Sequence, residues 1–185
     1  MAILQKLKEH FSRDSVTLDL QDIQAMILRS RPEPYVGVHA MLHFDEAAGA
    51  RNLLGRLAPH IASADNWSED LDFWIGAALS FEGLKALGVP DAQLKTFPLP
   101  FQQGMAARAE QLRDFGPNAP ENWEDVFKPG NCHLALTIYA VDDTALDKAL
   151  ATAHAELDRT AGVTLLGEHR FGAPEGAKNP FGFRD

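Results

Sequence analysis

The chain has little of what several common classes of protein require. Cysteine occurs once in 185 residues, at Cys132, which excludes an intramolecular disulfide and a zinc site built from cysteines. Residues 1–24 carry charges every few positions and contain no apolar run long enough for a signal peptide or a membrane span. These absences predict a protein of a reducing, cytoplasmic setting with no membrane partner.

Basic charge and the familiar catalytic motifs are also scarce. The 17 Lys and Arg residues are outnumbered by 26 Asp and Glu residues, and the net charge of -9 disfavours nucleic acids and anionic membranes as partners. The patterns GxGxxG, GxxxxGK[ST], GxSxG and HExxH do not occur, so the common nucleotide, acyl-transfer and zinc-hydrolase signatures are excluded. A neutral or cationic small molecule remains possible as a ligand.

What is present is enough apolar sequence, 45% of the residues, for one compact domain. Apolar residues recur at helical spacing from Ala50 to Ile61 and from Leu146 to Leu157, and Asp45 and Ser80 stand where helix caps belong. β-branched and apolar runs mark strands between these helices. The expected order is strand 35–44, helix 45–61, strand within 71–81, short helix 80–90, strand 132–140, helix 142–157 and strand 162–168.

Two strand–helix–strand units of this kind predict the α+β fold class. The specific expectation is a ferredoxin-like βαββαβ sandwich, with an antiparallel sheet and the helices on one face. An additional strand is expected at 22–28, which places the domain at 22–185 after an N-terminal extension at 1–21.

A proline-rich insertion separates the two units. Residues 89–130 hold six of the eleven prolines, and a stretch of this length inside a compact domain is usually functional. One helix is expected within it, at 101–112, in an excursion that resembles a lid.

Three groups of side chains have residue types that bind metals. His39 and His43 share one face of a predicted strand, about 13 Å apart, which is too far for one ion. Cys132 and His133 are adjacent on a strand and point to opposite faces, so Cys132 is expected in the core. The acidic run at 68–72 lacks the glycine-centred loop of a calcium site. No metal ligand is predicted.

The C-terminal stretch NPFGFRD, at 179–185, combines an apolar turn with a charged pair. Composition and periodicity leave two interpretations open, a β-turn at the end of a domain or part of a functional site.

Three stretches together resemble the dye-decolourising (DyP-type) heme peroxidases. They are DIQAMIL at 22–28, the long stretch from Phe81 to Asp125, and NPFGFRD at the end. The stretch within the insertion is the most specific, because it preserves the spacing FP..F..GM..RA..L.D.G...P.NW. The resemblance covers nearly the whole chain beyond the first twenty residues.

The resemblance implies a protein of two ferredoxin-like halves that uses hydrogen peroxide to oxidise an aromatic, dye-like reductant. Heme b would be held mainly by the C-terminal half, which would also supply the proximal histidine and a distal arginine. This chain corresponds to the N-terminal half, and it is expected not to bind heme productively or to be active alone.

The same resemblance assigns roles at the C-terminal stretch. The family turn reads Gly-x-x-Asp-Gly, and its first four positions match Gly182, Phe183, Arg184 and Asp185. Asp185 would be the distal acid–base residue. Gly182 would allow the turn, Phe181 and Phe183 would pack near the porphyrin edge, and Arg184 would either face solvent or pair with a heme propionate.

An alternative from another class is a non-catalytic ferredoxin-like module. Such a module would self-associate through its sheet edge or open sheet face, or would bind a small hydrophobic ligand. An isolated half exposes apolar surface, so a homo-oligomer is expected under either interpretation.

Overall fold

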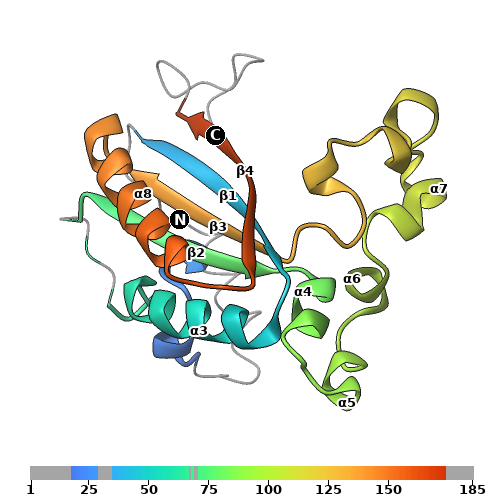
Figure 1. Ribbon diagram of the computed structural model, residues 1–185, viewed down its shortest axis with the longest axis horizontal. Helices are drawn as coiled ribbons and strands as arrows, with labels where there is room; N and C mark the ends of the chain where they lie inside the picture. Colours follow the sequence, from blue (N-terminus) through green and yellow to red (C-terminus); the bar gives the residue numbers. More distant parts are fainter. Residues whose placement is uncertain (1–17, 29–34, 67, 69–70, 174–185) are drawn as a thin grey trace, which may run out of the picture.

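The computed structural model describes residues 18–28, 35–66, 68 and 71–173, and these form a four-stranded sheet with helices on one face (Figure 1). The strands are β1 (Val36–Phe44), β2 (Phe73–Leu79), β3 (Leu134–Ala140) and β4 (Val163–Gly172), in the spatial order β2-β3-β1-β4. All neighbouring strands are antiparallel. This order and the helical crossovers confirm the ferredoxin-like βαββαβ fold.

Two helices, α3 (Ala47–Leu57) and α8 (Asp143–Asp158), cover one face of the sheet. Alternate strand residues such as Leu42, Leu136 and Ile138 point into the core between them and are fully buried. Each such side chain contributes about 1.5–3 kcal/mol relative to an exposed one. The carboxylate of Asp142 accepts a hydrogen bond from the Ala145 N–H at 2.8 Å, which caps the N-terminus of α8.

The predicted cap at the start of α3 is wrong. Glu46 is the N-cap residue and makes no side-chain cap bond, while the Asp45 carboxylate accepts from the Thr164 hydroxyl at 2.8 Å. The Asp45 and Glu46 N–H groups both donate to the Gly162 carbonyl, at 2.9 and 3.0 Å. The turn before β4 therefore holds the two residues that precede α3, while the predicted side-chain cap is not formed. At its other end, α3 ends at Leu57 and is followed directly by the 3-10 helix η2 (Ala58–His60).

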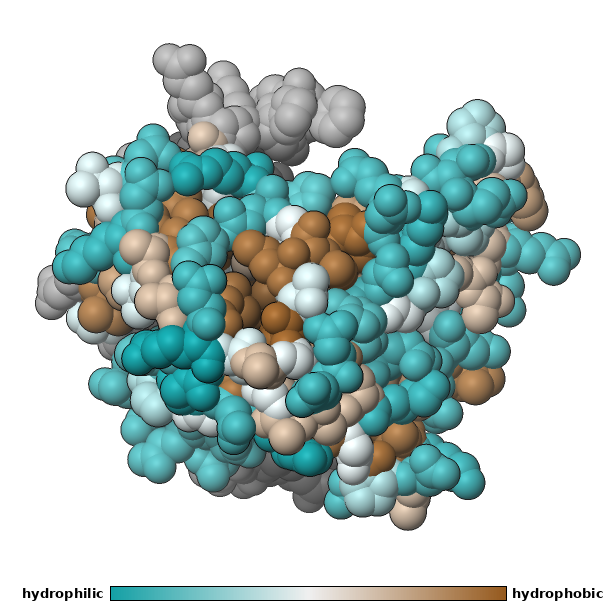
Figure 2. Space-filling model, in the orientation of Figure 1, coloured by the Kyte–Doolittle hydropathy of each residue, from teal (hydrophilic) through white to brown (hydrophobic). Residues whose placement is uncertain are grey.

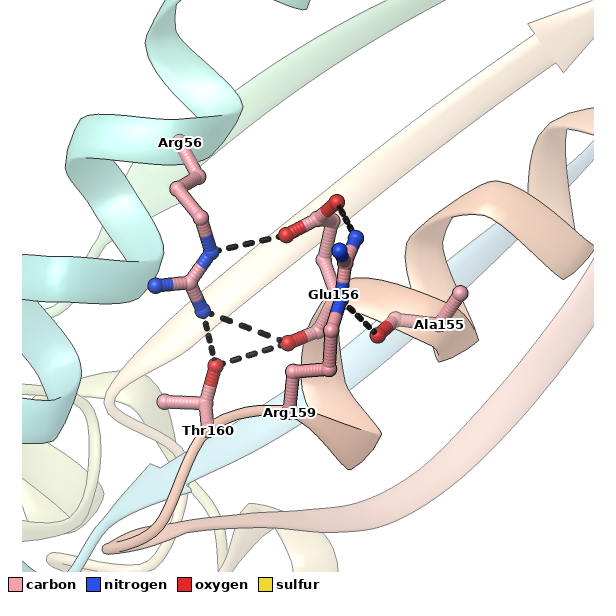
Figure 3. Close-up of polar contacts among 5 residues, drawn as sticks. All are labelled: Arg56, Ala155, Glu156, Arg159 and Thr160. Atoms are coloured by element: carbon pink, nitrogen blue, oxygen red, sulfur yellow. Dashed lines mark hydrogen bonds and ion pairs between the residues drawn. The ribbon is translucent and has the colours of Figure 1, made fainter.

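A polar cluster fastens the end of α3 to the end of α8 (Figure 3). The Arg56 guanidinium donates to the Glu156 carboxylate at 2.7 Å, to its carbonyl at 3.3 Å and to the Thr160 hydroxyl. Arg159 donates to the other carboxylate oxygen of Glu156 and to the Ala155 carbonyl. The Glu156 side chain is only 14% exposed, which reduces solvent screening of these contacts.

A double-mutant cycle of Arg56→Ala and Glu156→Ala is expected to give a coupling free energy of about 1 kcal/mol in urea unfolding. The physical reason is that removing either partner leaves a partly buried charge without its counterion. The matched control is the exposed Glu82–Lys85 pair on one helix, for which about 0.3 kcal/mol is expected. Equal coupling for the two pairs would contradict the proposed role of burial.

The predicted strand at 22–28 is wrong. This segment forms the 3-10 helix η1 (Leu20–Asp22) and the short helix α2 (Ala25–Leu28), with a single isolated bridge between Gln24 and Ser63. The side-chain amide of Gln24 takes the place of a strand, because it donates to the Ala77 carbonyl and accepts from the Ala77 N–H, both at 2.8 Å. One side chain thus pairs with one residue at the edge of β2.

The insertion contains helix, as predicted, but the prediction of one continuous helix at 101–112 is wrong. The residues form α6 (Leu99–Gln103), η3 (Ala106–Arg108) and α7 (Ala109–Leu112). The break falls at Gly104, whose φ of 69° and ψ of 178° no helix can contain. The other elements are α4 (Phe81–Ala86), α5 (Asp91–Leu94), η4 (Gly116–Asn118), η5 (Pro120–Asn122) and η6 (Asp125–Phe127). In Figure 1 the insertion projects from one side of the sandwich.

Other expectations for local structure are confirmed. The Ser80 hydroxyl caps α4 by accepting from the Gly83 N–H at 3.0 Å, and Gly88, at a φ of 78°, follows the end of that helix. Within the part of the chain that the structure describes, no helix is both long and apolar enough to cross a membrane. The proposed boundary between 1–21 and 22–185 stays a prediction.

Candidate functional site

The predicted site residues Phe181, Gly182, Phe183, Arg184 and Asp185 lie outside the described residues, within 174–185. Their assignment stays a prediction. The candidate sites that the structure does describe are a pocket in the insertion and the sheet face opposite α3 and α8.

The pocket has a volume of about 1130 Å³ and lies between two walls of the insertion. One wall comes from α4, α6, the turn after α6 and η3, and the other from the residues that follow η5, from η6 and from the residues before β3. Aromatic and apolar side chains dominate the lining: Phe81, Pro100, Phe101, Met105, Trp123, Phe127 and Pro129. A volume of this size suits an organic ligand or an apolar protein segment.

Several polar groups at the pocket already have partners. The Ser80 hydroxyl donates to the Cys132 carbonyl at 2.8 Å, and the Trp123 indole N–H donates to the Asn118 carbonyl at 2.9 Å. Lys128 pairs with Asp125 at 2.6 Å. Because these groups are satisfied within the insertion, they confer little preference for a polar occupant.

Figure 2 shows apolar side chains gathered in the middle of one face of the molecule, around β4 and toward the insertion. Exposed apolar residues in these regions include Leu165, which is 38% exposed, and Phe127, which is 44% exposed. Contiguous apolar surface of this kind marks sites of association or ligand binding.

Cys132 was expected in the core, and the structure corrects this. It is half-buried and lines the pocket, with its sulfur 3.7 Å from the Met41 sulfur and 3.6 Å from the Leu134 carbonyl oxygen. Burial raises the pKa of the Cys132 thiol, which keeps it protonated near neutral pH. A protonated thiol is a poor nucleophile and a poor metal ligand.

Among its described lining residues, the pocket does not fit heme as an iron site. It contains no histidine, and its only sulfur atoms belong to Met105 and to the protonated Cys132. No axial ligand of the histidine or thiolate type is therefore available from this part of the chain.

The face of the sheet opposite α3 and α8 is here called the open face. On β3, β1 and β4 it includes three cross-strand rows: Tyr139, Gly37 and Phe171; Thr137, His39 and His169; and Ala135, Met41 and Gly167. Over β2, helix α2 lies on the same face. Its Met26 side chain occupies the space that a Cβ at Gly76 would need.

Aromatic rings pack along the open face. The Phe171 ring stacks on His39 at 4.4 Å and meets Tyr139 edge-on at 5.0 Å, and it lies across Gly37, where a Cβ would overlap it. His39 also shares a hydrogen bond of 2.9 Å with the Thr137 hydroxyl. Burial, and then the proximity of His169, lowers the pKa of His39, so His39 is neutral at pH 7.

His43 and His133 form a second pair of histidines at the end of β1. Their rings stack at 4.2 Å, His43 donates from Nδ1 to the Asn131 carbonyl at 2.7 Å, and His133 Nδ1 accepts from the Phe44 N–H at 2.9 Å. Burial, and then His43, lowers the pKa of His133. Within the described ranges, no cluster of three or more His, Cys, Asp or Glu side chains is placed to hold a metal ion.

Comparison with known families decides the classification. The family model described as the DyP dimeric alpha+beta barrel domain matches residues 47–170, which span α3 to β4. The chain belongs to the DyP family. This match confirms the resemblance to the DyP-type peroxidases that the sequence showed.

Solved structures show the same fold at low sequence identity. The structure titled as that of DyP is 21% identical and superposes with a TM-score of 0.77 over 91% of this chain and 37% of its own. An ancestral D-type dye decolorizing peroxidase is 25% identical, with a TM-score of 0.76 over 91% of this chain and 38% of its own. A fungal DyP-type peroxidase from Auricularia auricula-judae is 21% identical, with a TM-score of 0.75 over 92% of this chain and 38% of its own.

This DyP-family chain thus spans little more than a third of the length of these three structures. No curated protein sequence matches it.

The sequence predicted an open sheet face as a surface for self-association but did not identify its residues, and it did not predict the pocket. The open-face residues on β1 and β3 were detectable, because His39, Thr137 and Tyr139 alternate with buried apolar residues along these strands. The pocket was not detectable, because it forms between segments that are distant in the sequence, residues 80–108 and residues 123–132.

Proposed function

We propose that this chain is the N-terminal half of a DyP-type heme peroxidase, which uses hydrogen peroxide to oxidise bulky aromatic reductants. The observation that carries the proposal is the family match over residues 47–170. The likeness to solved structures of dye-decolorizing peroxidases supports it.

Heme b, bound mainly by the second half of the protein, is the proposed cofactor and supplies the iron at which hydrogen peroxide is reduced. The proposal places the iron ligand outside this chain, in keeping with the lack of an axial ligand at the described pocket. The contribution of this chain is Asp185, as the acid–base residue that moves a proton between the peroxide oxygens. Phe181 and Phe183 would exclude water, Gly182 would shape the turn, and Arg184 would contact solvent or a heme propionate.

The full-length protein tests this proposal. Purified with heme, it is expected to show a sharp Soret band and to oxidise an anthraquinone dye only when hydrogen peroxide is present. A full-length protein that folds but neither retains heme nor oxidises the dye would refute the peroxidase assignment.

Self-association is a second proposed property, and the family description of a dimeric barrel supports it. Under the non-catalytic alternative, the apolar pocket would bind a small hydrophobic ligand, and its volume and aromatic lining favour that use. Trp123 reports on the pocket, so quenching of its fluorescence by a hydrophobic ligand, abolished by Met105→Glu, would support the alternative.

A further inference from the structure

The segment that carries the insertion leaves the sheet after β2 and returns to it before β3, and both ends of the segment meet at His133. The His133 carbonyl accepts from the Ser80 N–H at 3.0 Å, and it lies so close to Gly83 that a Cβ there would overlap it. The His133 N–H donates to the Leu42 carbonyl of β1 at 2.8 Å. One residue therefore joins the start of the insertion, its end and the sheet.

The side chain of His133 makes a contact that a proton destroys. The residue is 7% exposed, and its Nδ1 accepts from the Phe44 N–H at 2.9 Å. A neutral imidazole whose Nδ1 accepts a hydrogen bond carries its hydrogen on Nε2, so a second proton binds at Nδ1. Protonation of His133 therefore removes the acceptor and leaves the Phe44 N–H facing another donor in a buried place.

The neighbouring His43 differs in this respect, although its ring stacks on that of His133 at 4.2 Å. Its Nδ1 already donates to the Asn131 carbonyl at 2.7 Å, so a second proton binds at Nε2, which lies 4.0 Å from the Asp45 carboxylate. A proton on His43 preserves its hydrogen bond, whereas a proton on His133 breaks one.

The surroundings of His133 favour its neutral form. Burial, and then the proximity of His43, lowers the pKa of His133. The backbone of Gly130, the Glu82 carboxylate at the start of α4 and the Asp45 carboxylate at the end of β1 oppose this shift without cancelling it. His133 is therefore neutral at pH 7, the state that its hydrogen bond requires.

We propose that His133 is a pH-sensitive switch for the insertion: the neutral ring fastens both ends of the insertion to β1, and the protonated ring releases them. Release also loosens the pocket, because two of its lining residues, Ser80 and Cys132, are bonded to His133 and adjacent to it, respectively. This inference goes beyond the proposed function and depends neither on heme nor on self-association.

The direction of the pH effect follows from the lowered pKa of His133. In the released state His133 meets water and regains an ordinary pKa of about 6.5. The closed state is fully favoured above that value, and its advantage is lost as the pH falls from there toward the lower pKa of the closed state. The ratio of released to closed chains should rise about 3- to 10-fold between pH 7.5 and pH 5.5, where about 10-fold is the limit for one histidine.

Amide hydrogen exchange of the 185-residue chain, followed by NMR without heme or peroxide, measures the release. The relevant N–H groups are those of Phe44, Ser80 and His133, which make the hydrogen bonds of the junction. Their protection factors, corrected for the intrinsic pH dependence of exchange, should fall about 3- to 10-fold from pH 7.5 to pH 5.5. The N–H of Ile138, within β3, should keep its protection.

His133→Asn is the decisive variant, because Oδ1 of asparagine accepts a hydrogen bond close to the position of Nδ1 and does not titrate. Protection at the junction should then be the same at both pH values. The matched control is His60→Asn, which makes the same substitution at an exposed histidine of η2 and should retain the wild-type pH dependence.

A second variant leaves His133 unchanged. His43→Phe keeps a ring against His133 but removes the other histidine, so the pH dependence should remain. Wild-type protection that is independent of pH, a His133→Asn chain with the wild-type pH dependence, or a loss of pH dependence in His43→Phe would each overturn the inference. If His133→Asn does not fold, the wild type and His43→Phe still decide the question.

Discussion

Replacing Asp185 with asparagine in the full-length protein is expected to slow peroxide-dependent dye oxidation about 10²- to 10⁴-fold, at unchanged heme content. The physical reason is that an amide cannot accept and return the proton that a carboxylate moves. An aspartate has an ordinary pKa of about 3.9, so it remains a base in mildly acidic solution, where a histidine is already protonated. The measurements are the steady-state rate and the Soret absorbance of each variant.

The control for this substitution is Asp91→Asn, which makes the same chemical change at an exposed position at the start of α5. It should leave both rate and heme content unchanged. If Asp185→Asn turned over dye at the wild-type rate, Asp185 would lose its proposed role. Loss of heme in that variant would instead assign the residue to the fold of the heme pocket.

Gly49→Ala is expected to destabilise the chain by about 1–3 kcal/mol, although alanine is the better helix former. A Cβ at Gly49 would overlap the carbonyl oxygen of Ala161, in the turn that docks on the start of α3. That turn also accepts the two backbone hydrogen bonds of Asp45 and Glu46 through Gly162. The added methyl group therefore forces apart the contact that joins α3 to β4.

Gly55→Ala, in the same helix, is the matched control. No atom lies within 4 Å of a Cβ built at Gly55, so the substitution should stabilise the chain by about 0.5–1 kcal/mol. Urea unfolding of both variants gives the comparison. Changes of the same sign at Gly49 and Gly55 would show that helix propensity, and not the approach of Ala161, decides the outcome.

Much of the fold could be predicted because its elements depend on local patterns. The alternation in β1 and β3 and the apolar stripes of α3 and α8 reflect burial on one face, and a single sequence shows that periodicity. The errors occurred where a distant group replaced a local one. Gln24 pairs with Ala77 through its side chain, and the Asp45 carboxylate accepts from the distant Thr164 hydroxyl instead of capping α3.

The candidate site was less predictable for the same reason. Residue type alone suggested a core position for Cys132, whereas its position beside the pocket depends on how the insertion returns to β3. The pairing of His39 with His169 depends on strand register, which connects residues 130 positions apart. The assignment of Asp185 came from resemblance, and it lies outside the described residues.

The most direct test of the central claim compares this chain with the full-length protein after hemin is added to each. The claim is that the chain is one half of a DyP-type peroxidase and depends on a second half for heme. It predicts a sharp Soret band and peroxide-dependent dye oxidation for the full-length protein, and neither, beyond the background of free hemin, for the 185-residue chain. A chain of 185 residues that alone gives both signals, or a folded full-length protein that gives neither, would contradict it.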